Sequence, residues 1–165
     1  MNLRTTFPLA TWVVASALVT TVLGGTALAQ SNNPHLGLWK ANAAKSKVSS
    51  GTALKSGTTK IEAAGAGVKY TVDIVFVDGS VRHWEFTTNY DGKDTRVTGN
   101  SPFGDVVALT RDDARTVRIV NKKDGKVIST QTSVVSNDGK MRTVTAKGTD
   151  ALGQTIDAST TYEKQ

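Results

Sequence analysis

The chain has 165 residues, a formal net charge of +6 at pH 7 and no cysteine. This length fits one domain with a core large enough to fold without covalent cross-links, and the lack of cysteine excludes disulfides and thiolate metal sites. The positive charges are spread along the chain rather than gathered in a basic run, which argues against nucleic-acid binding.

Residues 1–29 have the pattern of a secretory signal peptide. Arg4 supplies a positive charge, residues 12–23 are apolar apart from serine and threonine, and Ala27-Leu28-Ala29 offers small residues at a cleavage site. The uninterrupted apolar stretch is shorter than the ~20 residues that a membrane-spanning helix needs. We therefore expect a periplasmic or secreted mature protein, residues 30–165, with no membrane span after cleavage.

Beyond Pro34 the sequence alternates between apolar and polar residues. One alternating run has its apolar members at Val68, Tyr70, Val72, Ile74 and Phe76. A second run places Trp84, Phe86 and Thr88 on one face. Period two with β-branched and aromatic residues predicts half-buried strands. Asp-Gly follows or separates such runs at residues 78–79, 91–92, 124–125 and 138–139, which indicates tight hairpins.

The runs between these turns predict about ten strands. We expect them at residues 35–41, 56–64, 67–77, 81–90, 93–98, 105–111, 115–122, 126–135, 140–148 and 154–164. Residues 42–55 are rich in serine, lysine, alanine and glycine, so we expect a long loop or a weak helix there.

The predicted fold is all-β: an antiparallel up-and-down barrel of about 8–10 strands, because closing a long meander removes its exposed edges. A two-sheet β-sandwich is the alternative architecture. In either case we expect the core to contain Trp39, Val72, Ile74, Trp84 and Phe86.

Gly37-Leu38-Trp39-Lys40 resembles the G-x-W that opens the first strand of lipocalins and fatty-acid-binding proteins, in which the tryptophan closes the bottom of the barrel. Residues 160–164, Thr-Thr-Tyr-Glu-Lys, are similar to the last strand of fatty-acid-binding proteins, and residues 137–141 to their penultimate hairpin. The resemblance implies an exported lipocalin-like (calycin) barrel. Those proteins anchor a ligand carboxylate with an arginine at the position of Thr160, so the resemblance carries the fold rather than that anchor.

Few residues have the arrangement that catalysis or metal binding requires. His83 shares an outward face with Glu85 and can neighbour Asp73, which we interpret as a solvated pair rather than a metal site. His35 precedes the first strand and is expected to be exposed. The chain has no G-x-S-x-G elbow and no glycine-rich loop before a helix. We therefore predict no enzyme, no metal and no cofactor.

Hairpin register predicts where the arginines meet. A loop at residues 112–114 would pair Arg111 with Arg115, and the next two hairpins would pair Arg115 with Val134 and Val134 with Arg142. All three arginines would then lie on the inward face at one barrel mouth, together with Tyr70, Tyr90 and Tyr162. Such a cluster would bind an anionic or aromatic ligand, unless neighbouring aspartates neutralise it.

The predicted function is that of an exported, non-enzymatic binding protein for a small amphipathic or acidic apolar ligand. The candidate ligand-binding residues are Tyr70, Phe76, Trp84, Phe86, Tyr90, Arg111, Arg115, Arg142 and Tyr162. The alternative is an envelope protein-interaction module with a filled barrel and an exposed apolar patch around Val75, Val77 and Val81. A barrel enzyme ranks lowest.

Overall fold

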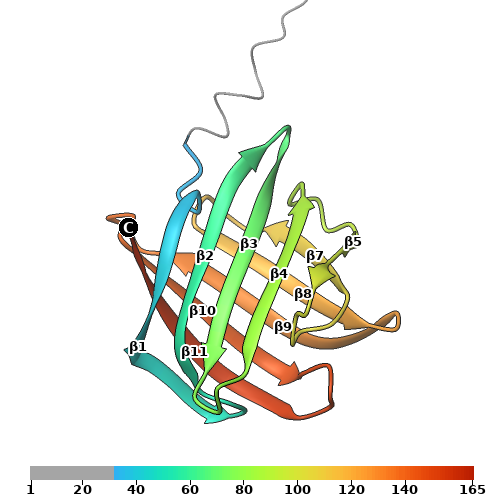
Figure 1. Ribbon diagram of the computed structural model, residues 1–165. Helices are drawn as coiled ribbons and strands as arrows, with labels where there is room; N and C mark the ends of the chain where they lie inside the picture. The colour runs from blue at the N-terminus through green and yellow to red at the C-terminus, as the bar shows by residue number, and fades with distance from the viewer. Residues whose placement is uncertain (1–31) are drawn as a thin grey trace, which may run out of the picture.

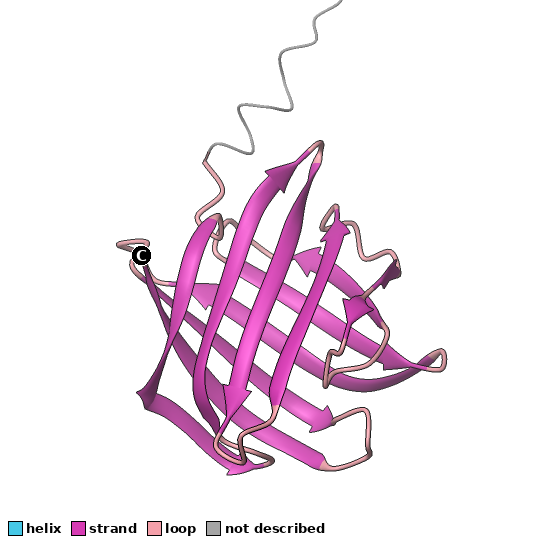
Figure 2. Cartoon of the chain, in the orientation of Figure 1, coloured by secondary structure: helices cyan, strands magenta, loops and turns pink. Residues whose placement is uncertain are grey.

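The computed structural model describes residues 32–165. The predicted signal peptide, residues 1–29, lies outside this range. The described chain consists of strands joined by turns and loops, as Figure 2 shows. None of its segments forms a helix long and apolar enough to cross a membrane.

Eleven strands follow one another along the chain. They are β1 (Gly37–Ser50), β2 (Leu54–Ala64), β3 (Gly67–Phe76), β4 (Val81–Thr88), β5 (Thr95–Arg96), β6 (Thr98–Gly99), β7 (Val106–Arg111), β8 (Thr116–Lys123), β9 (Lys126–Val135), β10 (Met141–Thr149) and β11 (Thr155–Lys164).

All of the strands belong to one antiparallel sheet, in the order β5-β7-β8-β9-β10-β11-β1-β2-β3-β4-β6. The two ends of this order, β5 and β6, are separated by Val97 alone. The sheet therefore curls into an almost closed barrel, in which β1 to β4 lie in front of β8 to β11 (Figure 1). The barrel prediction is confirmed, and the sandwich alternative is wrong because there is one continuous sheet.

The seam of the barrel explains why eleven strands appear where about ten were expected. The predicted strand at residues 93–98 is split: Thr95 and Arg96 pair with β7, whereas Thr98 and Gly99 pair with β4. Gly99 has a φ of 100°, and a Cβ there would collide with the His83 carbonyl oxygen. A glycine is thus needed where the chain crosses from one sheet edge to the other.

The loop or weak helix expected at residues 42–55 is wrong, because β1 continues to Ser50. After a bulge, Lys47, Val48 and Ser50 pair with residues 159–157 of β11. Within the bulge, Asn42 Oδ1 accepts a hydrogen bond from the Lys45 amide at 3.1 Å, and the Ser46 hydroxyl donates to the Asn42 carbonyl at 2.8 Å. Pairing with β11, which is far away in the sequence, overrides the weak local preference of this segment.

The predicted core is confirmed. Trp39, Val72, Ile74, Trp84 and Phe86 are all buried. They are joined by Tyr162, which lies opposite Ala41 of β1. Three of the four predicted Asp-Gly hairpins are confirmed: those at residues 78–79, 124–125 and 138–139 join β3 to β4, β8 to β9 and β9 to β10, and their glycines have φ between 70° and 84°. The hairpin expected at residues 91–92 is wrong, because Asp91 forms a bridge with Thr110 and the following strand, β5, pairs with β7 rather than with β4. These local signals, apolar alternation and turn chemistry, thus place most of the barrel wall.

Candidate ligand-binding site

The barrel encloses a cavity of about 320 Å³. One end of it is rimmed by the turns after β1, β3 and β10, which lie at the bottom of Figure 1. The wall formed by β3 and β4 is apolar and aromatic. It consists of Tyr70, Val72, Ile74, Phe76, Trp84 and Phe86, and Phe103 adds an edge-on contact with Trp84 at 6.0 Å between ring centroids.

The opposite wall mixes apolar and polar side chains, and Val107, Ile119, Val144 and Ala146 are among its apolar members. Its cavity-lining residues include Asn121 of β8, Gln131 of β9 and Arg142 of β10. The Asn121 amide nitrogen donates a hydrogen bond to the Ser129 hydroxyl at 3.1 Å. The cavity therefore has two different faces, one that suits hydrocarbon or aromatic rings and one that offers hydrogen bonds.

Arg142 lies at the inner end of this cavity. Only 4% of the residue is exposed, and its Nε donates a hydrogen bond to the Ser133 hydroxyl at 2.8 Å. Its guanidinium carbon lies 5.1 Å from the centroid of the Tyr162 ring. Nη1 is buried without a hydrogen-bond partner. A buried cation in this state favours the binding of an anion beside it.

The aspartates that could have neutralised the arginines have other partners. Asp112 binds Arg118 at 2.6 Å, Asp113 accepts hydrogen bonds from two backbone amides of its own turn, and Asp138 accepts one from the Lys140 amide. Among residues 32–165, no carboxylate forms an ion pair with Arg111 or Arg142. The positive charge at this end of the barrel is therefore not balanced by the described part of the chain.

Behind Arg142 the barrel is capped by a second polar layer. The Arg111 guanidinium stacks over the Tyr90 ring at 4.3 Å, and the Tyr90 hydroxyl lies 3.5 Å from the hydroxyl of Tyr70 and from the Asn33 amide nitrogen. Burial, and next the neighbouring Tyr90, raise the pKa of Tyr70 well above its ordinary value. Burial likewise raises the pKa of Tyr162. Both phenols therefore stay protonated.

His35 is part of this cap, and the expectation that it would be exposed is wrong. It is 0% exposed, and neither ring nitrogen has a hydrogen-bond partner. Burial, and next the charges of Arg142 and Arg111, lower the pKa of His35 from 6.5 to about 4. The residue is fixed by its backbone, since its carbonyl accepts a hydrogen bond from Trp39 Nε1 at 2.8 Å. The segment before β1 thus closes this end of the barrel.

The structure brings together most of the predicted site residues. Those that line the cavity are Tyr70, Phe76, Trp84, Phe86, Arg142 and Tyr162. Tyr90 and Arg111 lie behind its floor, in contact with each other and, through Tyr90, with Tyr70. The cluster was expected at a barrel mouth, which is wrong: it occupies the end that residues 33–36 close, opposite the open end.

Arg115 does not belong to the cluster. It is exposed and donates a hydrogen bond to the Asn137 side-chain oxygen at 2.9 Å. The observed register pairs Arg111 with Val117 and not with Arg115. The reason is Asp113, whose Oδ1 accepts hydrogen bonds from the amides of Arg115 and Thr116 at 2.7 and 2.9 Å. This turn places Arg115 in the loop rather than at a strand end.

The predicted inward position of Val134 is also wrong. A bulge leaves Ile128 of β9 unpaired, since Lys122 pairs with Val127 and Asn121 with Ser129. The extra residue exchanges the two faces of the rest of β9, so Val135 is buried and Val134 is exposed.

Arg142 still points inward, as predicted. It pairs with Val135 rather than Val134, because the turn between β9 and β10 is one residue longer than expected. The bulge and the longer turn each shift the register by one residue, and the two shifts cancel.

Sequence reasoning missed Gln131, Asn121, Phe103 and His35. The polar run Ser129-Thr130-Gln131-Thr132-Ser133 was a usable signal, because a strand with no apolar residue on either face must turn polar groups into the barrel. Phe103 and His35 lie in loops, where no periodicity indicates which way a side chain points.

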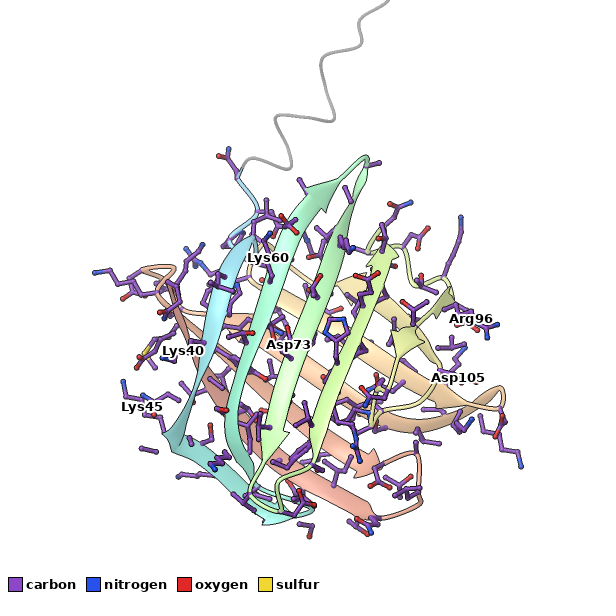
Figure 3. The ribbon with its side chains drawn as sticks, viewed as in Figure 1. Lys40, Lys45, Lys60, Asp73, Arg96 and Asp105 are labelled. Atoms are coloured by element: carbon purple, nitrogen blue, oxygen red, sulfur yellow. The ribbon has the colours of Figure 1, made fainter. Side chains whose placement is uncertain are left out.

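The His83 pair lies outside the barrel. Asp73, labelled in Figure 3, is on the outer face of β3, and its Oδ1 lies 2.7 Å from His83 Nδ1. Glu85 on the same face binds Lys69 at 2.8 Å. Within residues 32–165, no three histidine, aspartate or glutamate side chains converge in a way that could hold a metal ion.

No protein-family model matches this chain, and neither the curated proteins nor the solved structures contain a significant match. The class that the geometry defines is that of an antiparallel β-barrel with an internal, two-faced cavity.

Proposed function

We propose that this protein is an exported, non-enzymatic binding protein for a small amphipathic molecule with an acidic head and an apolar body. The observation that carries this proposal is Arg142, a buried guanidinium with an unpartnered Nη1 at the inner end of an open cavity. A charge removed from water without a counterion is costly, so a site of this kind favours a ligand that brings the missing anion.

The remainder of the cavity supports the apolar body of the ligand. Trp84 and Phe86 face the interior from β4, and Tyr70 stacks on Phe86 at 4.8 Å between ring centroids. The volume of about 320 Å³ is near the lower limit of roughly 300–1,000 Å³ for small-molecule pockets. This volume favours a compact ligand over a long lipid.

The proposed location, periplasmic or secreted, rests on the signal-peptide pattern of residues 1–29. The resemblance to lipocalins and fatty-acid-binding proteins supports the binding role. Trp39 of the G-x-W motif is fully buried at the closed end of the barrel, where those families place this tryptophan. A barrel with a closed bottom and an open cavity is an architecture that can hold a small ligand.

The test is a calorimetric titration of the exported protein with decanoic acid and with decanol. We expect decanoic acid to bind more tightly, because a charge-assisted hydrogen bond from Arg142 contributes ~1.5–3 kcal/mol, or about 10- to 150-fold in affinity. Arg142→Met should abolish this preference, whereas Arg115→Met removes the same charge from the exposed side of the same end and should retain it. Equal affinities for acid and alcohol in the wild type would contradict the acidic head.

A second candidate function is that of an envelope protein-interaction module. The observation in its favour is an outward apolar pair, Val77 and Val81, which are 62% and 59% exposed on either side of one turn. Replacing both with lysine should release a protein partner captured by cross-linking in the native host, and should leave decanoic acid binding unchanged.

A further inference from the structure

The inward face of β9 is a column of polar side chains. Beyond Val135, the residues that point into the barrel are Ser133, Gln131 and Ser129, and all three are buried. Apolar side chains normally fill such positions, because a buried polar group costs free energy unless it is hydrogen-bonded. The column therefore has a role beyond packing.

Two of the three polar residues are satisfied within the chain. Ser133 accepts the hydrogen bond from Arg142 Nε at 2.8 Å, and Ser129 accepts the one from the Asn121 amide at 3.1 Å. Gln131 lies between them and lines the cavity. It is 8% exposed, and within residues 32–165 its side chain has no hydrogen-bond partner. An amide has four hydrogen-bonding positions, and none of those on Gln131 is occupied by another described residue.

The strand geometry sets the distance between this amide and the acid site. Gln131 and Ser133 are two residues apart on one strand, which is about 7 Å at roughly 3.4 Å per residue. Gln131 pairs with Ala146, whose side chain is a single methyl group. Across the barrel, Val72 and Trp84 offer hydrocarbon and aromatic surface but no acceptor.

We propose that the ligand is an acid that carries a second hydrogen-bonding group, such as a hydroxyl or a carbonyl, about 7 Å from its acidic head. The acidic head binds Arg142, the second group binds the Gln131 side chain, and the opposite edge of the ligand packs on the β3–β4 wall. This inference rests on the proposed function and specifies the chemical class of ligand that the same cavity binds. Gln131 is the residue that determines this specificity.

The test compares decanoic acid with a hydroxydecanoic acid whose hydroxyl lies about 7 Å from the carboxyl carbon. Both are titrated by calorimetry into the exported protein. We expect the hydroxy acid to bind roughly three- to tenfold more tightly to the wild type, the effect of one neutral hydrogen bond. Gln131→Leu should remove this preference and bind decanoic acid at least as well as the wild type. Gln165→Leu, which removes an exposed amide that does not line the cavity, is the matched control and should retain the preference.

Each outcome distinguishes the inference from the proposed function. If both acids bind the wild type equally, or if the preference survives in Gln131→Leu, the inference is wrong and the proposed function stands. If neither acid binds, both are wrong. The wild-type comparison needs no variant, so the inference remains testable even if Gln131→Leu fails to fold.

Discussion

The two ends of the barrel are built from different chemistry. At the open end, short turns satisfy their own polar groups; Asp150 Oδ1, for example, accepts hydrogen bonds from the Leu152 and Gln154 amides. At the closed end, buried polar atoms of His35, Arg111 and Arg142 lack partners, whereas toward the other end the described residues leave only Asp105 Oδ1, just before β7, without one. The open end is thus nearly complete by itself, whereas the closed end holds two arginines whose charge no described carboxylate pairs with.

This difference indicates that the closed end of the barrel lowers the stability of the folded chain. Unsatisfied buried donors each cost about 1–3 kcal/mol, and two guanidinium groups without a carboxylate add to that cost. Such groups persist in a fold when they serve a site, because hydrophobic residues of the same volume would pack as well or better. We therefore expect substitutions at the closed end to change the free energy of unfolding strongly, and in some cases to raise it rather than lower it. Substitutions at the open end should change it little.

The largest expected effect comes from Trp39, which is 0% exposed at the closed end. Trp39→Ala should lower the free energy of unfolding by ~3–5 kcal/mol, because it opens a void and removes the hydrogen bond to His35. Leu152→Ala, at an 80% exposed position of the open end, should change it by less than about 0.5 kcal/mol. Urea unfolding measures both. Similar losses for the two variants would show that the ends do not differ.

The next effect is on the pH dependence of stability. The pKa of His35 is about 4 in the folded chain, below its ordinary value of 6.5, so the unfolded chain binds the proton more readily. The stability that neutral His35 contributes is therefore complete above pH 6.5 and declines as the pH falls toward 4. The loss amounts to about 3 kcal/mol.

His35→Phe removes the titratable imidazole. The substitution should reduce the difference in unfolding free energy between pH 7.5 and pH 4.5 by about 2–3 kcal/mol. His83→Phe is the control, since His83 is on the exposed outer face. An unchanged pH profile in His35→Phe would mean that His35 does not titrate against the arginines.

The smallest effect concerns whether the buried charge of Arg142 lowers the free energy of unfolding. Arg142→Met should leave the free energy of unfolding unchanged or raise it by about 1 kcal/mol, because the gain from removing an unbalanced buried charge exceeds the lost hydrogen bond to Ser133. Arg115→Met should leave it unchanged. A loss of more than about 2 kcal/mol in Arg142→Met, by thermal or urea unfolding, would mean that the charge is balanced in the folded chain.

The apolar wall of the cavity could be read from the sequence. β3 and β4 are joined by one tight Asp-Gly turn and pair without a bulge, so Val72 and Trp84 face the interior as their alternation predicts. The inward position of Arg111 follows from the same rule applied to β7. These positions depend only on near neighbours in the chain, which is why local periodicity is sufficient to find them.

The polar residues of the opposite wall could not be found in this way. The unpaired Ile128 exchanges the faces of β9, and its carbonyl oxygen lies where a Cβ on Gly148 of β10 would collide. The bulge therefore depends on a glycine twenty residues away in a neighbouring strand. No pattern within β9 itself records it.

Side-chain period and turn chemistry alone place most of the strands, the Asp-Gly turns at residues 78–79, 124–125 and 138–139, the apolar face of each regular hairpin and the meeting of arginine with tyrosine. Contacts made in the folded barrel set the rest: β1 continues to Ser50, Arg115 lies outside, His35 is buried and Gln131 faces the cavity. Each of these depends on a contact between distant segments, which changes a register or closes an end of the barrel. A one-residue change of register exchanges the two faces of a strand. The bulge at Ile128 therefore determines which residues of β9 face the cavity.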